Sequence, residues 1–173
     1  MSKHARGASP SPSVVLADCV EDLRGLAAEA DRSGAAGSLH AVRLSSKRLR
    51  YTAELLQDDL GEQVKPIVRA AKRIQTALGD VHDLDLRIEM IEDELVDVQL
   101  ELAAASSATI AEDPGRAADA LAALVGPIPD DPRPGLIALL SSEHQQRRDA
   151  LARYRAAWDR LETALVERPG RTS

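Results

Sequence analysis

Apolar residues recur every three or four positions over most of the chain, which is the period of an amphipathic α-helix. Near the N-terminus this pattern predicts a helix over about residues 13–32. After the loop "SGAAGS" it predicts a second helix, which begins at a capping Ser38 and runs to Leu60. Gly61 follows and can adopt the left-handed conformation that stops a helix. The first third of the chain is therefore predicted to be helix and loop only.

The same period continues through the rest of the sequence. Pro66 fits the first turn of a third helix, which Gly79 would end, and Asp80 or Asp83 would cap a fourth. A Pro-rich stretch then has room for one short helix, before a long last helix over about residues 135–167. No stretch alternates between apolar and polar residues for long enough to predict a β-strand. The predicted class is all-α, an antiparallel helical bundle with a long C-terminal helix.

The composition indicates one helical domain between two tails. The chain has 173 residues, which is enough for one substantial core. Residues 1–12 and 168–173 are rich in Ser, Pro, Gly and charge, so we expect them to be disordered and the domain to cover residues 13–167. Aromatic residues make up only 2 % of the chain and Phe is absent. Leu, Ala, Val and Ile must therefore fill the core, which suits closely packed helices.

The sequence also limits where the protein is expected to be found. Cys19 is the only cysteine, so an intrachain disulfide cannot form and a reducing compartment is the simplest expectation. No apolar stretch is long enough for a signal peptide or a membrane span. We expect a soluble, cytoplasmic protein that has no membrane partner.

Charge is unevenly distributed along the chain, whose formal net charge is −6. Residues 40–82 carry eight Lys and Arg against five Asp and Glu, whereas residues 83–113 carry one against ten. Such separation produces a dipolar surface, and its basic side can attract polyanions. The acidic total argues against indiscriminate coating of nucleic acid, and the scarcity of aromatic residues argues against base stacking on single strands. We expect no specific nucleic-acid partner. The expected ligand is anionic, repetitive and free of bases.

The cations of the predicted second helix are separate from its core face. At 100° per residue, His40, Arg43, Lys47 and Arg50 lie within about 80° of one another. Val42 and its apolar neighbours at seven-residue spacing lie on a different face. The cations therefore form a ridge that the core does not need.

The predicted third helix repeats this arrangement, with Lys65, Arg69 and Lys72 on one stripe and aliphatic residues on another. The connection "LGEQV" is short and favours an antiparallel hairpin of the two helices. The two cationic stripes could then flank one groove. Three arginines of the last helix could extend this groove: Arg147, Arg148 and Arg155.

Two segments resemble the signature of the CHAD family, helical domains named for their histidines. "HAVRLSSKRLRY", from His40 to Tyr51, matches His-x-x-Arg-x-x-x-Lys-Arg-Leu-Arg-Tyr, and "LGDVHDLD", from Leu78 to Asp85, matches Leu-Gly-x-x-His-Asp-x-Asp. "QQRRDALARYRAAWDRL" is similar to the arginine-rich terminal helix of a CHAD repeat. The resemblance covers about residues 14–165. It implies a domain that binds inorganic polyphosphate on a basic helical surface, in some members at polyphosphate granules. The sequence itself has no Ser/His/Asp or Cys/His arrangement, no phosphate-cradling Gly loop and no metal cluster, so we expect neither catalytic activity nor a cofactor.

The resemblance also implies which residues make the contacts. Arg43, Lys47 and Arg50 would be the principal phosphate contacts, with Lys72 facing them from the next helix. His40 lies one turn before Arg43 and could donate a hydrogen bond to a phosphate oxygen. Arg48 could contact phosphate or pair with a carboxylate instead. The further candidates are Lys65, Arg69, Arg73 and Arg148.

The chain departs from the family pattern in one respect. CHAD domains commonly contain two related halves, each with its own His-x-x-Arg helix, and this sequence has only one. We expect two chains to pair about a twofold axis and to restore the full basic channel as a homodimer. The alternative is a half-size domain that binds alone or has lost the activity.

Three other functions are also considered: metal binding, histidine phosphotransfer and protein docking. His82, Asp83 and Asp85 include metal-ligand types, but no second ligand cluster accompanies them, so capping and ion pairing are favoured and no metal is expected. His40 followed by Arg43 resembles a histidine phosphotransfer module, although Leu44 stands where such modules usually have Gly. A helical scaffold that docks an acidic protein partner would show no polyphosphate binding.

Overall fold

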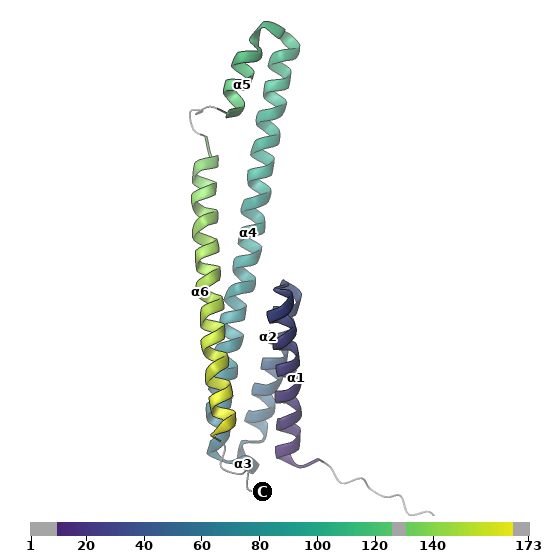
Figure 1. The fold of residues 1–173 in the computed structure, drawn as a ribbon, viewed down its shortest axis with the longest axis vertical. Helices are drawn as coiled ribbons and strands as arrows, with labels where there is room; N and C mark the ends of the chain where they lie inside the picture. The colour runs from purple at the N-terminus through teal and green to yellow at the C-terminus, as the bar shows by residue number, and fades with distance from the viewer. Residues whose placement is uncertain (1–9, 126–130, 168–173) are drawn as a thin grey trace, which may run out of the picture. The chain divides into compact units, whose positions relative to one another are not determined.

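The structure is a computed structural model that describes residues 10–125 and 131–167. Across these two ranges the chain is helical and contains no strand, which confirms the predicted all-α class. The predicted tail residues 1–9 and 168–173 lie outside the described residues, whereas Pro12 already opens the first helix. The helices are α1 (Pro12–Ser33), α2 (Ala36–Leu55), α3 (Gln57–Leu60), α4 (Lys65–Glu112), α5 (Ala117–Val125) and α6 (Arg133–Val166), labelled in Figure 1.

These helices group into two compact units. The first unit contains α1, α2, α3, the part of α4 up to His82 and the part of α6 from Asp149 onward. The second unit contains the remainder of α4, α5 and the first part of α6. None of the described helices combines the length and the apolar composition needed to cross a lipid bilayer.

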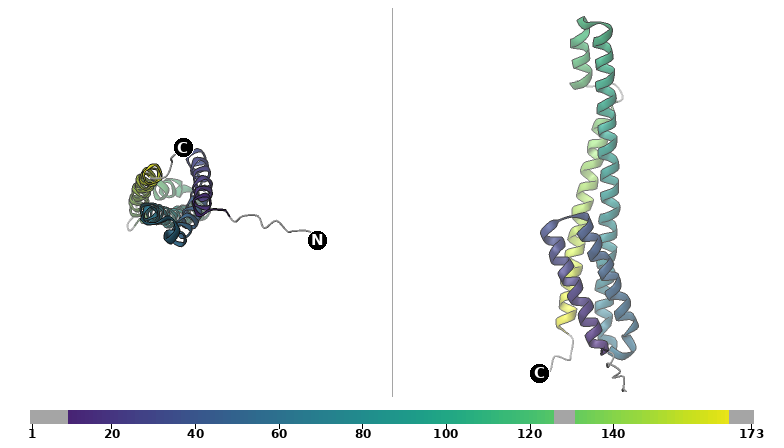
Figure 2. Two further views of the ribbon diagram at one scale, coloured as in Figure 1. Left: turned by 90° about the horizontal axis from the view of Figure 1, so that it is seen from below. Right: turned by 90° about the vertical axis from the view of Figure 1, so that its right-hand side faces the viewer.

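The core of the first unit is built from aliphatic side chains at helical spacing. α1 and α2 pack side by side, as the views in Figure 2 show. The best-covered large side chains, each below 2 % exposure, include Leu16, Leu23, Leu49, Ile67, Ile74 and Leu161. Complete burial of such a side chain stabilises the fold by about 1.5–3 kcal/mol. The inward-facing apolar positions therefore account for the packing of four different helices.

An ion pair between α1 and α6 and an aromatic pair within α6 support this core. Arg24 on α1 donates to both carboxylate oxygens of Glu162 on α6, with the shorter N···O distance 2.6 Å. Hydrogen bonding from this guanidinium lowers the pKa of Glu162. Tyr154 packs edge-on against Trp158 with the ring centroids 6.4 Å apart, and burial raises the pKa of Tyr154 to about 12.

Gly79 does not end a helix, which corrects the prediction from the sequence. α4 continues through it without interruption, and Asp80 and Asp83 lie inside the helix instead of capping a new one. A glycine within a helix costs about 1 kcal/mol relative to alanine. Leu78 and Val81, on either side, are almost fully buried, so their packing outweighs that cost.

The start of α2 also differs from the prediction, whereas the stop at Gly61 is confirmed. α2 begins at Ala36, and Ser38 lies in its first turn, where its hydroxyl bonds to the Ser33 hydroxyl at 2.9 Å instead of capping the helix. Gly61 has φ 73°, in the region that favours glycine, and ends α3. The segment predicted as one helix up to Leu60 is thus two helices, α2 and α3.

In the second unit, α4 and α6 are joined by ion pairs. Arg87 donates to Glu143 at 2.9 Å, and Arg147 pairs with Asp85. Glu143 is only 8 % exposed, so its pairing with Arg87 satisfies a carboxylate that would otherwise be buried alone. The hydroxyl of Ser106 donates to the carbonyl of Ala120 and fastens α5 to α4.

Candidate anion-binding surface

The register of α2 against α4 is fixed by two contacts within the first unit. The amide of Gln75 donates to the carbonyl of Ser46 at 3.2 Å, and a Cβ added to Gly79 would lie 3.6 Å from Nε of Arg43. The two helices are therefore antiparallel, with residue 43 opposite 79 and residue 46 opposite 75. Continued by one turn, this register brings Arg50 level with Lys72.

Arg43 lies over the bare backbone of Gly79. Its Nε is buried and has no hydrogen-bond partner in the part of the chain that the structure describes. An unsatisfied buried donor costs about 1–3 kcal/mol, and more when the group is charged. An oxygen supplied by an anionic ligand would relieve that cost.

Arg50 shows the same feature two turns further along the same face of α2. Its Nη1 donates to Glu54 at 2.9 Å, yet its Nε is buried and lacks a partner among the described residues. The guanidinium lies 4.2 Å from the ring centroid of Tyr51, and Nζ of Lys47 lies 5.8 Å from the same centroid. The aromatic ring therefore holds two cations together on the surface of α2.

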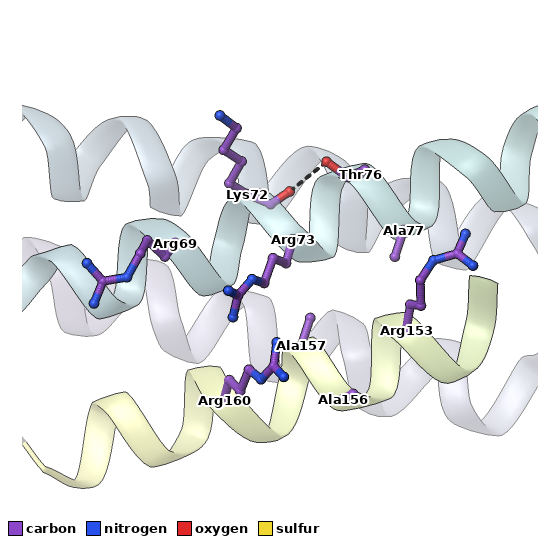
Figure 3. Close-up of a pocket in the computed structure, with 9 residues that line it drawn as sticks. All are labelled: Arg69, Lys72, Arg73, Thr76, Ala77, Arg153, Ala156, Ala157 and Arg160. Carbon is purple, nitrogen blue, oxygen red and sulfur yellow. Dashed lines mark hydrogen bonds between the residues drawn. The ribbon is translucent and has the colours of Figure 1, made fainter. Parts of the chain in front are cut away.

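A pocket between α4 and α6 extends the cationic region. Its volume is about 480 Å³, and Figure 3 shows side chains from both helices around it. No carboxylate lines it, and three alanines form its apolar part. Arg153 pairs with Asp80 at 2.8 Å, whereas the other four cations of the lining form no salt bridge within the described residues. The cations that line this pocket are Arg69, Lys72, Arg73, Arg153 and Arg160.

Lys72 connects this pocket to the cations of α2. It lines the pocket, but in Figure 3 its ammonium end points away from α6, whereas Arg73 points toward α6. Lys72 also precedes Gly79 by seven residues, which places the two about 20° apart around α4. Cations therefore lie on α2, on α4 and on α6 in succession, with α4 in the middle. We call this set the basic surface; it comprises Arg43, Lys47, Arg50, Arg69, Lys72, Arg73, Arg153 and Arg160.

Three further candidates from the sequence have other neighbours. Arg48 pairs with Asp22 on α1 at 3.1 Å, which is the alternative that the sequence left open. Lys65 pairs with Glu62 in the turn before α4. His40 is exposed, and its ring centroid lies 6.2 Å from that of His82 on α4.

The arginines predicted on the last helix are not the ones that line the pocket. Arg148 lies in the second unit and bonds to Gln145, and Arg147 pairs with Asp85 in that unit. Arg155 lines a different pocket beside Trp158. Arg153 and Arg160 were missed by the sequence analysis. Their seven-residue spacing places both on one side of α6, and that was the available signal.

The predicted metal-ligand types do not gather into a site. Within the described ranges, no group of three or more His, Cys, Asp or Glu side chains is arranged to hold a metal ion. Asp85 pairs with Arg147 instead.

Comparison with known proteins gives one match. The model of the CHAD domain family matches residues 6–92, which is half of the chain. The matched stretch includes the α2 and α4 cations of the basic surface but not those of α6. No curated protein and no solved structure matches the chain.

Proposed function

The chain belongs to the CHAD family, a family of binding domains associated with polyphosphate, and we propose that it binds inorganic polyphosphate along the basic surface without transforming it. The observation that carries the proposal is the pair of buried, unpartnered Nε atoms on Arg43 and Arg50. Both arginines come from the helix that contains the family signature. Charged donors left in this state favour a ligand that is rich in oxygen and negative charge.

The layout of the basic surface favours an extended ligand. Its cations come from three helices, α2, α4 and α6, so one compact phosphate group could contact only some of them. A chain of phosphate groups could contact several in succession. Exposed contacts of this kind contribute only about 0–1 kcal/mol each, and better-formed charged hydrogen bonds about 1.5–3 kcal/mol. Useful affinity therefore requires many contacts, as a repetitive ligand provides.

The same layout disfavours single-stranded nucleic acid. Tyr51 is the aromatic side chain beside the α2 cations, and Arg50 and Lys47 already lie against its ring. Stacking of a base would have to displace these cations, which are themselves needed for the phosphates.

The test is a titration of the full chain with polyphosphate at two salt concentrations, with double-stranded DNA as competitor. If single-strand behaviour applies, log K falls with log salt by about 0.7 for each phosphate neutralised. We expect a steep slope and little displacement by DNA. A binding constant that is insensitive to salt would contradict an ionic surface.

The single signature helix supports a second part of the proposal, namely that two chains pair about a twofold axis and present two basic surfaces to one polyphosphate. Light scattering at micromolar concentration tests this directly. A monomer that binds polyphosphate would refute pairing and leave the binding proposal in place. We place this binding in the cytoplasm, at polyphosphate granules.

A further inference from the structure

The second unit contains an apolar face that no described element covers. Leu86, Met90, Val96 and Leu100 on α4 are exposed by 48 %, 71 %, 57 % and 63 % respectively. At 100° per residue, these four side chains lie within about 120° around the helix. Exposed apolar side chains grouped in this way mark interaction sites more often than scattered ones do.

The opposite face of the same stretch is already packed. Leu84, Ile88 and Ile91 are no more than 8 % exposed. α4 therefore has two apolar faces here, and only one of them is used by the fold. The exposed face is not required for packing within the described residues of this unit.

Carboxylates occupy the centre and both edges of this face. Asp93 and Asp97 lie between the apolar residues, within about 20° of the direction of Leu86. Glu89 lies between Leu100 and Val96 around the helix, and Glu92, Glu94 and Glu101 lie along the edges; all four are exposed. None of these six carboxylates forms a salt bridge within the described ranges, and Arg87, the one cation of residues 83–113, is paired with Glu143. The face is thus apolar and uniformly negative. We call Leu86, Met90, Asp93, Val96, Asp97 and Leu100 the outer stripe.

A second copy of this chain is a poor occupant for the outer stripe. If two stripes met in parallel register, Asp93 would face Asp93 of the other copy. In the antiparallel register centred on the stripe, Asp93 would again face Asp93, and Asp97 would face Glu89 of the other copy. Like charges placed together in this way oppose association.

An amphipathic helix with cations on its contact face has the opposite properties. Its apolar side chains could pack on Leu86, Met90 and Leu100, and its Lys or Arg side chains could pair with Asp93 and Asp97. Met90 is unbranched and can adapt to different partner side chains. At 1.5 Å per residue the stripe is about 21 Å long, which matches about four turns of a partner helix.

We propose that the outer stripe is the docking surface for a cationic amphipathic helix of another protein. This surface is independent of the basic surface, because its residues belong to the second unit and carry the opposite charge. Polyphosphate binding and helix docking can therefore succeed or fail separately.

The experiment uses the full chain and a fluorescent synthetic peptide of about four turns, made of Leu and Lys with the leucines on one face. A control peptide has the same composition in an order that destroys the apolar face. We expect the amphipathic peptide to bind at least about tenfold more tightly than the permuted one and to gain helicity on binding. Fluorescence anisotropy and circular dichroism measure these two effects.

Variants of the protein locate the binding. Asp93→Lys with Asp97→Lys should weaken binding of the amphipathic peptide at least about tenfold. Met90→Gln with Leu100→Gln should weaken it while leaving the charge unchanged. The matched control is Asp58→Lys with Asp59→Lys, which makes the same change of charge on exposed residues of α3 and should have little effect. All replaced residues are exposed, so thermal unfolding should change little.

Two outcomes would overturn the proposal. Equal binding of both peptides would show that the stripe attracts positive charge without recognising a helix. Self-association of the wild type that is abolished by Asp93→Lys with Asp97→Lys, without peptide binding, would show that the occupant is a second copy.

Discussion

The first and second parts of α4 belong to one continuous helix but have opposite surface chemistry. Up to His82, its outward positions carry Lys65, Arg69, Lys72 and Arg73. Beyond that residue the outward positions carry carboxylates and exposed apolar side chains. The inward positions are alike, since Ile67 and Ile74 are buried in the first part as Ile88 and Ile91 are in the second.

The comparison separates what builds the helix from what the helix presents. Buried aliphatic residues at helical spacing are sufficient to hold α4 against its neighbours in each unit. The outward positions are free of that requirement, and we propose that one part binds anions and the other a cationic partner. Substitutions at outward positions should therefore change binding while leaving the fold intact, and the following variants test this difference.

The largest effect is expected when the α2 cations are reversed. Arg43→Glu with Arg50→Glu removes two charge-assisted contacts and adds repulsion, so polyphosphate affinity should fall about a hundredfold or more. Stability should not fall by more than about 1 kcal/mol, because neither side chain fills the apolar core and each has a buried Nε without a partner among the described residues. Isothermal titration calorimetry and thermal unfolding measure the two quantities. Arg32→Glu with Arg116→Glu, two exposed arginines outside the basic surface, is the charge-matched control, and an equal loss of affinity there would show a general charge effect only.

Reversal of one cation in the α4–α6 pocket should have a smaller effect. Arg160→Glu should weaken polyphosphate binding about tenfold, since one of several cations is lost and a negative charge enters the pocket. Arg155 is on the same helix but lines another pocket. Arg155→Glu should therefore change affinity less than about twofold. If the two variants behave alike, α6 contributes no specific contact.

Removal of a competing carboxylate should strengthen binding modestly. Asp80 pairs with Arg153, and Asp80→Asn would leave that guanidinium available to the ligand. We expect affinity to rise about two- to threefold, because the pair is roughly half exposed and surface pairs contribute about 0–1 kcal/mol. A decrease in affinity would indicate that Asp80 holds Arg153 in the orientation that binding needs.

The smallest effect on binding is expected at Gly79, where stability should increase instead. Gly79→Ala should stabilise α4 by about 0.5–1 kcal/mol through helix propensity. The added Cβ would lie 3.6 Å from Nε of Arg43, an ordinary contact, so affinity should change less than about twofold. Loss of binding as large as in the Arg43→Glu variant would mean that Arg43 must approach the backbone more closely when the ligand is bound.

The sequence predicted most of the helices and the cationic face of the α2–α4 pair, because both depend on local spacing. It failed at Gly79, where propensity favoured a stop and the packing of Leu78 and Val81 favoured continuation. It also named Arg147, Arg148 and Arg155 as the arginines of the last helix that extend the groove, whereas Arg153 and Arg160 line the pocket in the structure. That choice depends on how α6 is rotated about its axis against α4, and this rotation is set by tertiary packing.

The outer stripe also could not be predicted from the sequence. Leu86 and Met90 continue a helical apolar period, so pattern alone cannot distinguish them from core residues. Only the exposed fraction of each side chain shows that α4 packs through Leu84 and Ile88 instead.

The buried Nε of Arg43 above Gly79 links ligand binding to the thermal stability of the domain. In the unfolded chain its Nε would regain water, whereas in the folded chain it lacks a partner among the described residues. A ligand that meets the cations of the basic surface gathered only in the folded form stabilises that form, by about 2.7 kcal/mol at a hundredfold excess over Kd when the unfolded chain does not bind it. The melting temperature of this domain should therefore report the polyphosphate concentration around it.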